Sequence, residues 1–129
     1  MLQHEKLCGE VLALDPSIRF AGLVDHLGSL IATVYRPGLV PLATREETGR
    51  YAGQAIYMTG ALAGGFNSRV GRMQYVVGKY ENLMRATVPV VSSGYDKFYL
   101  MLSFDVGSNV ISIIEEKVMP FLEKSGRSF

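Results

Sequence analysis

Apolar and polar residues alternate along the first part of this chain in blocks that predict a helix followed by a hairpin. Leucine and valine at helical spacing predict a short amphipathic helix over the first 14 residues. Asp15-Pro16 ends this helix, because a residue that precedes proline avoids the helical conformation. Two apolar runs rich in β-branched and aromatic residues, Ile18–Asp25 and Ser29–Tyr35, then predict two strands joined by the short turn His26-Leu27-Gly28.

The pattern changes to a long helix, three strands and a final helix in the rest of the chain. Thr44 and Glu47 have the spacing of a capping box, which predicts a helix over Arg45–Gly64. Ser108 or Asn109 caps the last helix, which ends before Gly126, and Pro120 is expected to kink it because proline removes a backbone donor. The three strands between the helices are predicted over Met73–Tyr80, Leu83–Val91 and Lys97–Asp105.

The order helix, two strands, helix, three strands, helix predicts an α+β sandwich, α-β-β-α-β-β-β-α, within one domain spanning residues 1–129. Short connections make consecutive strands antiparallel neighbours. The first and fifth strands are apolar on both faces, so we expect them at the centre of a five-stranded sheet covered by helices on both faces. The fourth strand carries Arg85 and Pro89 and belongs near an edge, with the third strand outermost.

The long helix is unusually rich in glycine. Gly49 with Gly53, and Gly60 with Gly64, are spaced four residues apart. Each glycine inside a helix costs about 0.5–1 kcal/mol relative to alanine. The missing side chains permit close approach of another backbone, belonging either to a second copy of the helix or to the protein's own sheet, and the sequence leaves both explanations open.

The third strand is long, apolar and free of proline, and an edge of this kind invites pairing with another chain. Together with the glycine helix it predicts a homodimer. On the strand, the predicted interface residues are Met73, Tyr75, Val76 and Val77; on the helix, they are Gly49, Gly53, Gly60 and Gly64.

The composition of the chain argues against several classes of partner and of cellular location. Thirteen Lys and Arg against twelve Asp and Glu leave a net charge of +1 over 129 residues, so no whole-domain field attracts nucleic acid or an anionic membrane. Cys8 is the only cysteine, which excludes an internal disulfide and suits a reducing compartment. With no secretion signal and no apolar stretch long enough to cross a bilayer, we expect a cytoplasmic protein.

Candidate chemistry is sparse. His4 and Cys8 make a lone pair where a metal would need three or four ligands. Asp25, His26 and Ser29 lie beside the first turn, where turn formation explains them better than acid-base work. We therefore expect no enzyme, no cofactor and no metal.

A local basic group falls on and before the third and fourth strands. It consists of Arg69, Arg72, Lys79 and Arg85, with Tyr75 and Tyr80 between them. Arginine and tyrosine are found together where RNA or phosphate is bound, but scattered surface charge is the default explanation. We do not expect a nucleic-acid partner.

In Arg19–Ala32 an apolar strand ends in Asp, then Gly, and a second apolar strand follows. This segment resembles the opening hairpin of Roadblock-type domains. The whole chain is similar to a small uncharacterised archaeal family of this type, through Tyr80-Glu81 and Arg85–Pro89, followed by Leu100–Asp105.

This resemblance implies a non-enzymatic homodimer that regulates or scaffolds protein partners, small GTPases and motor complexes among them, through paired third strands and second helices. The chain departs from the pattern in its glycine-rich second helix. Roadblock-type domains share their order of elements with a wider profilin-like group that includes sensor domains. The alternative is therefore a small-molecule sensor with a cavity between the helix and the sheet.

Overall fold

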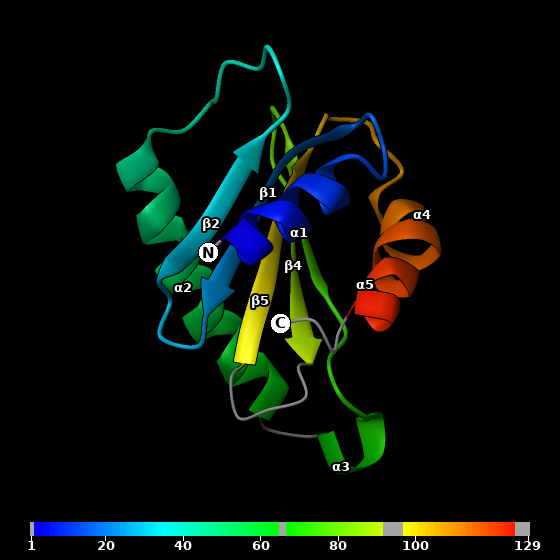
Figure 1. Ribbon diagram of the computed structural model, residues 1–129. Helices are drawn as coiled ribbons and strands as arrows, with labels where there is room; N and C mark the ends of the chain where they lie inside the picture. Colours follow the sequence, from blue (N-terminus) through cyan, green and yellow to red (C-terminus); the bar gives the residue numbers. More distant parts are fainter. Residues whose placement is uncertain (1, 65–66, 92–96, 126–129) are drawn as a thin grey trace.

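The computed structural model describes residues 2–64, 67–91 and 97–125, and Figure 1 shows how they are arranged. The strands are β1 (Ile18–Asp25), β2 (Leu30–Tyr35), β3 (Val76–Lys79), β4 (Met84–Val91) and β5 (Lys97–Phe104). The helices are α1 (Leu2–Leu12), α2 (Arg45–Gly64), α3 (Asn67–Val70), α4 (Val110–Ile113), the π-helical η1 (Ile114–Val118) and α5 (Met119–Ser125). The short α3 is an addition to the predicted order.

The strands form one antiparallel sheet in the order β2-β1-β5-β4-β3. β1 and β5 lie inside the sheet and β3 lies at one edge, as the apolar character of their faces predicts. The predicted α+β sandwich, α-β-β-α-β-β-β-α with a five-stranded antiparallel sheet, is confirmed.

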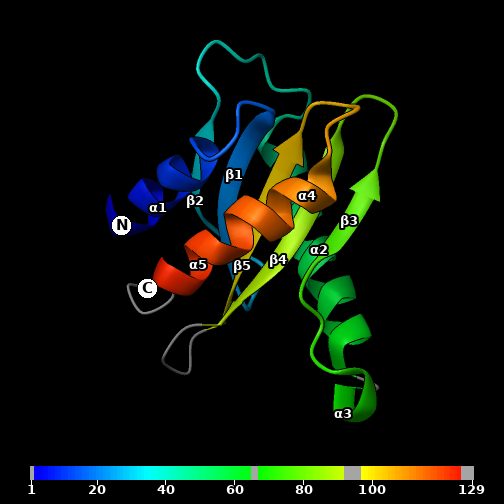
Figure 2. The same ribbon diagram turned by 90° about the vertical axis from the view of Figure 1, so that its right-hand side faces the viewer.

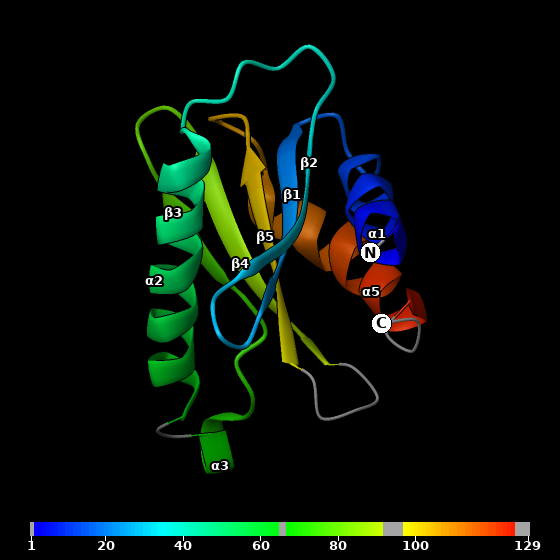
Figure 3. The ribbon, with the colours of Figure 1, turned by 60° about the vertical axis from the view of Figure 1, so that its left-hand side comes forward.

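Helices cover both faces of the sheet, and Figure 3 shows the three layers. α2 packs on one face, and α1 with the C-terminal helices packs on the other, which is the face turned toward the viewer in Figure 2. Within the described ranges, no helix is long and apolar enough to cross a membrane. The buried core under α2 consists of Phe20, Val24, Ala52, Ala55, Ile56 and Met101. The larger core on the other face includes Val11, Leu23, Val88, Leu102 and Ile114.

The β1–β2 turn is held by the side chain of Asp25. Its Oδ1 accepts hydrogen bonds from the backbone amides of Leu27 and Ser29, both at 2.9 Å. Gly28 has a φ of 88°, which glycine adopts without strain, and His26 is exposed. The structural explanation of this segment, a turn and not an acid-base pair, therefore accounts for each of its polar residues.

The predicted third strand, Met73–Tyr80, is too long. β3 spans only Val76–Lys79, and Val76 pairs with Thr87 of β4. Continuing this register would place Gln74 opposite Pro89, which has no N–H to donate to a ladder. The ladder between β3 and β4 therefore ends before it reaches the proline.

The C-terminal helix differs from the sequence prediction at its start and near Pro120. Asn109 occupies the N-cap position, but its side chain makes no capping hydrogen bond. The hydroxyl of Ser108 instead donates to the carbonyl of Asp105 at 2.6 Å. The irregularity expected at Pro120 takes the form of η1, where the amide of Met119 donates to the carbonyl of Ile114, five residues earlier.

Candidate functional site

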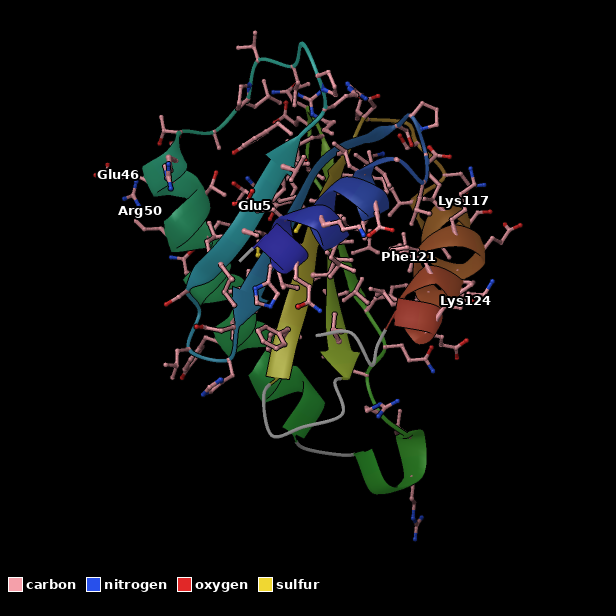
Figure 4. All side chains as sticks on the ribbon, viewed as in Figure 1. Glu5, Glu46, Arg50, Lys117, Phe121 and Lys124 are labelled. Carbon is pink, nitrogen blue, oxygen red and sulfur yellow. The ribbon has the colours of Figure 1, made fainter. Side chains whose placement is uncertain are left out.

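The side of α2 that faces away from the sheet carries large apolar side chains without cover. Tyr57 is 81% exposed and Met58 is 62% exposed. Figure 4 shows Glu46 and Arg50 extending outward from the first turns of the same helix. We call this surface, formed by Glu46, Arg50, Gln54, Tyr57 and Met58, the α2 outer face.

The first two glycines of α2 have open space around them. A Cβ atom added at Gly49 or Gly53 would meet no atom within 4 Å apart from its chain neighbours and the backbone of its own helix. A Cβ atom added at Gly28 would lie 3.1 Å from the Cα of Gly53, so the β1–β2 turn approaches the helix backbone closely. The close approach therefore requires glycine at position 28, whereas a side chain at position 53 would have room. The surroundings of Gly60 and Gly64 lie outside the described residues.

The two flanks of α2 face opposite edges of the sheet. Gly53 is next to Gly28 of the β1–β2 turn, whereas the ring of Tyr51 lies over the guanidinium of Arg85 on β4. Met58 follows Tyr51 by seven residues, which is about two helical turns, so both are on one flank. Met58 is therefore on the flank nearer β3, and Gly53 is on the flank farther from it.

The predicted interface residues around β3 point in different directions. The hydroxyl of Tyr75 donates to Glu115 of η1 at 2.5 Å, and both Tyr75 and Val77 pack against the core under the C-terminal helices. Val76 is their neighbour in the strand, so its side chain points to the α2 face of the sheet. Met73 precedes β3 and lines a cavity near α5. What β3 offers to a second chain is mainly its free backbone edge.

The four predicted basic residues do not form one patch. Arg69 is exposed on α3, and Arg72 lines the cavity near α5. Lys79, two residues after Val77, points to the face of the C-terminal helices, whereas Arg85 points to α2. Of these four residues, only Arg85 belongs to the cluster of side chains that lines a cavity beneath α2.

This cluster lies beneath α2, where one row of residues crosses the sheet. The cross-strand pairs place Ser103 between Phe20 and Arg85, with Tyr35 beyond Phe20 and Gly78 beyond Arg85. Ser103 is small, so it leaves a low point between two large neighbours. A cavity of about 50 Å³ lies there, and we call it the α2 cavity.

The walls of the α2 cavity come from the sheet, the helix and the β2–α2 connection. Ser103, Met101, Phe20, Tyr35 and Arg85 contribute from the strands; Thr48 and Tyr51 contribute from α2. Leu39, Pro41, Leu42 and Ala43 border it from the connection, whose end is fixed by the predicted capping box. The amide of Thr44 donates to Glu47 at 2.8 Å, and the amide of Glu47 donates to the Thr44 hydroxyl at 3.1 Å.

Two aromatic rings lie close to Arg85 at this cavity. Its guanidinium carbon lies 3.9 Å from the ring centre of Tyr51 and 5.0 Å from that of Tyr80. Burial, with hydrogen bonding to Tyr80 as the next cause, raises the pKa of Tyr51 to about 12. Tyr51 therefore stays neutral near pH 7 and does not cancel the charge of Arg85.

Arg19 reaches the same cavity because of a β-bulge. The register between β1 and β5 shifts between Ile18 and Phe20, which turns Arg19 to the same face as Phe20. Its guanidinium donates to Asp105 at 3.2 Å, and Asp105 also accepts two hydrogen bonds from Arg36 at 2.8 and 3.0 Å. These arginines, with Arg36 first, hold the pKa of Asp105 below its usual range.

The remaining candidates for chemistry stay apart. Cys8 is fully buried, and burial raises the pKa of its thiol to about 11, so it is a poor nucleophile near neutral pH. His4 contacts the ring of Phe98. In the part of the chain that the structure describes, no three His, Cys, Asp or Glu side chains gather as metal ligands.

Sequence reasoning missed Tyr51, Ser103 and Arg19 as members of one cluster. Alternation along β4 and β5 does place Arg85 and Ser103 on a common face once the register is known. The bulge at Arg19 has no marker in the sequence, because its residues alternate like those of a regular strand.

Comparison with known proteins shows the fold of Roadblock/LC7 domains. The gliding protein MglB of Thermus thermophilus is 19% identical, with a TM-score of 0.65 over 97% of this chain and 83% of that one. MglB of Myxococcus xanthus is 14% identical, with a TM-score of 0.68 over 95% and 90%. A Roadblock/LC7 domain from Streptomyces avermitilis is 14% identical, with a TM-score of 0.65 over 94% and 92%. No family model and no curated protein matches the sequence.

Proposed function

We propose that this protein is a non-enzymatic homodimer that regulates or scaffolds protein partners, with a small GTPase as the first partner to test. The observation that carries the proposal is the α2 outer face, where Met58 exposes apolar surface on the flank nearer the β3 edge and Tyr57 exposes more on the same helix. Apolar surface left open next to an unpaired strand favours an interface between proteins. The shared fold with MglB of two bacteria supports the same class of function.

In the proposed dimer, the β3 edges of two copies pair, and the flanks of α2 that carry Met58 meet beside them. This geometry retains the β3 strand of the predicted interface. On α2 it shifts the contact from Gly53 toward Met58, because Gly53 lies on the opposite flank. A two-fold axis would place each Met58 near its equivalent, so one substitution changes the interface twice.

Sedimentation velocity at protein concentrations from about 1 to about 100 µM tests the dimer, with Met58→Lys as the variant. An unpaired lysine buried twice per dimer should weaken self-association by about tenfold or more. Ile111→Lys is the matched control, because Ile111 is 58% exposed on α4, at the other face of the sheet, and it should leave the dimer intact. A wild-type monomer throughout this range, or equal effects of both variants, would overturn the proposal.

Partner binding needs a separate measurement. Fluorescence anisotropy with a labelled small GTPase from the same organism, loaded with GDP or a GTP analogue, should show binding that Met58→Lys weakens along with the dimer. Binding of neither form by the wild-type protein would remove the GTPase from the proposal and leave the scaffold function to other partners.

The proposal also includes the domain organisation of the protein and its location in the cell. We expect residues 1–129 to act as one Roadblock-like domain in the cytoplasm. The thiol of Cys8, buried against the carbonyl of Ala32, fits a reducing compartment.

A further inference from the structure

The α2 cavity holds a positive charge that lacks a counter-charge. Within the described ranges, Arg85 forms no ion pair, whereas Arg19 shares the carboxylate of Asp105 with Arg36. A half-buried charge without a partner is costly, and in a cavity it attracts a ligand of opposite charge. This feature is independent of the proposed dimer, because it lies between α2 and the protein's own sheet.

Two aromatic rings lie close to the guanidinium of Arg85. Its central carbon is 3.9 Å from the ring centre of Tyr51 and 5.0 Å from that of Tyr80, which are cation–π distances. The N–H groups of a guanidinium form a fork that matches the two oxygens of a carboxylate, and five donors leave room for a ligand beside any contact with the tyrosines. The two rings limit the movement of the fork before a ligand arrives.

The size of the cavity limits what it can hold. Its volume of about 50 Å³ compares with roughly 10–15 Å³ for a single water and at least about 300 Å³ for a drug-sized ligand. A group of a few heavy atoms fits, and a nucleotide does not. Phe20, Leu83 and Met101 give the walls an apolar part, and Ser103 adds a hydroxyl group, whereas the hydroxyl of Thr48 already donates to the carbonyl of Thr44.

We propose that the α2 cavity binds a short-chain aliphatic carboxylate, such as propionate. Arg85 binds the two carboxylate oxygens through its fork, the hydroxyl of Ser103 donates a further hydrogen bond, and the aliphatic end contacts Met101. A singly charged ligand is favoured over phosphate, because the second arginine at the cavity, Arg19, is already paired with Asp105. The sensor alternative raised by the sequence thereby gains a defined site and ligand class.

A titration followed by two-dimensional NMR tests this site, using propionate, acetate and inorganic phosphate as probes at constant ionic strength. Propionate should give saturable shifts in the amide signals of Thr48, Arg85 and Ser103, with affinity at least about tenfold above that of phosphate. Absence of saturable shifts with propionate, or tighter binding of phosphate, would overturn the proposal.

Variants distinguish specific binding by the guanidinium of Arg85 from a general effect of positive charge on the protein. Arg85→Gln should weaken propionate binding by about tenfold or more, because a charge-assisted hydrogen bond contributes this much. Arg69→Gln removes one positive charge from an exposed site and should leave binding unchanged. If Arg85→Gln does not fold, Ser103→Val decides, since it fills the cavity floor and removes a hydroxyl while Arg85 stays. Unchanged affinity in Ser103→Val then refutes the site. Sedimentation without ligand reports the dimer separately, so the two proposals can fail independently.

Discussion

The contact between Gly28 and Gly53 makes a sharp prediction about why the β1–β2 turn requires glycine at position 28. Gly28→Ala would place a Cβ atom 3.1 Å from the Cα of Gly53, in a helix backbone that has little room to move. Gly28 also has a φ of 88°, so alanine there is strained even without the contact. The two costs can be separated, because Gly38 has a similar φ of 77° but open space where its Cβ would be.

The magnitudes follow from these two geometries. The left-handed conformation costs alanine about 1–2 kcal/mol, and the stiffer unfolded chain offsets roughly 0.4–1 kcal/mol of this. Gly38→Ala should therefore lower the free energy of unfolding by about 1 kcal/mol. Gly28→Ala adds the cost of forcing the turn and the helix apart, about 1–3 kcal/mol as for other overpacked sites, so its total is about 2–4 kcal/mol.

Urea unfolding followed by circular dichroism measures both losses, provided that the slope m is the same in the two variants. Equal losses for Gly28→Ala and Gly38→Ala would refute the close approach of the turn to α2.

Alanine at Gly53 then tests whether this flank of α2 meets a second copy of the helix. Open space around its Cβ predicts a gain of about 0.5–1 kcal/mol from helix propensity. Weaker self-association in Gly53→Ala would show that this flank meets a second copy, against the geometry proposed for the dimer.

Two further predictions concern local interactions. Thr44→Ala removes the hydroxyl that accepts from Glu47 and should cost about 1 kcal/mol in thermal or urea unfolding, with Thr44→Ser restoring most of it; no loss would refute the capping role. Hydrogen bonds from Lys117 and Ser17 lower the pKa of Asp15 from 3.8 to about 2, so its contribution to stability is full above about pH 4 and is lost as the pH falls toward 2. Asp15→Asn should reduce stability at neutral pH and flatten the pH dependence in this window, and unfolding curves from about pH 2 to about pH 7 that keep the wild-type slope would contradict the assignment.

Much of the fold could be predicted because it follows from local rules. The helix Arg45–Gly64 starts and ends where its cap and glycines indicate, and the two-sided apolar character of β1 and β5 places them inside the sheet. β3 was predicted too long because its extent depends on its partner. Pro89 limits the ladder between β3 and β4. The register that brings Pro89 opposite Gln74 depends on how the two strands pair, and this is a tertiary property.

The α2 cavity illustrates what the sequence could not supply. Arg85 was grouped with Arg69, Arg72 and Lys79 because they are close along the chain, but strand alternation sends Lys79 to the opposite face. The partners of Arg85 come from α2 and from the β3–β4 turn. Only the packing of the helix on the sheet brings the ring centre of Tyr51 to 3.9 Å from the guanidinium carbon of Arg85.

α2 is therefore the element on which both proposals meet. Tyr51 borders the cavity, and Met58 lies two turns later on the same flank, at the proposed dimer contact. Binding equilibria at two such sites are linked: if propionate changes the dimer constant by some factor, dimerisation must change propionate affinity by the same factor. Sedimentation with and without saturating propionate, set beside NMR titrations of wild type and Met58→Lys, measures that factor from both directions. A factor of one from both would show that α2 serves the two sites independently, and unequal factors would mean that one of the two sites has been misassigned.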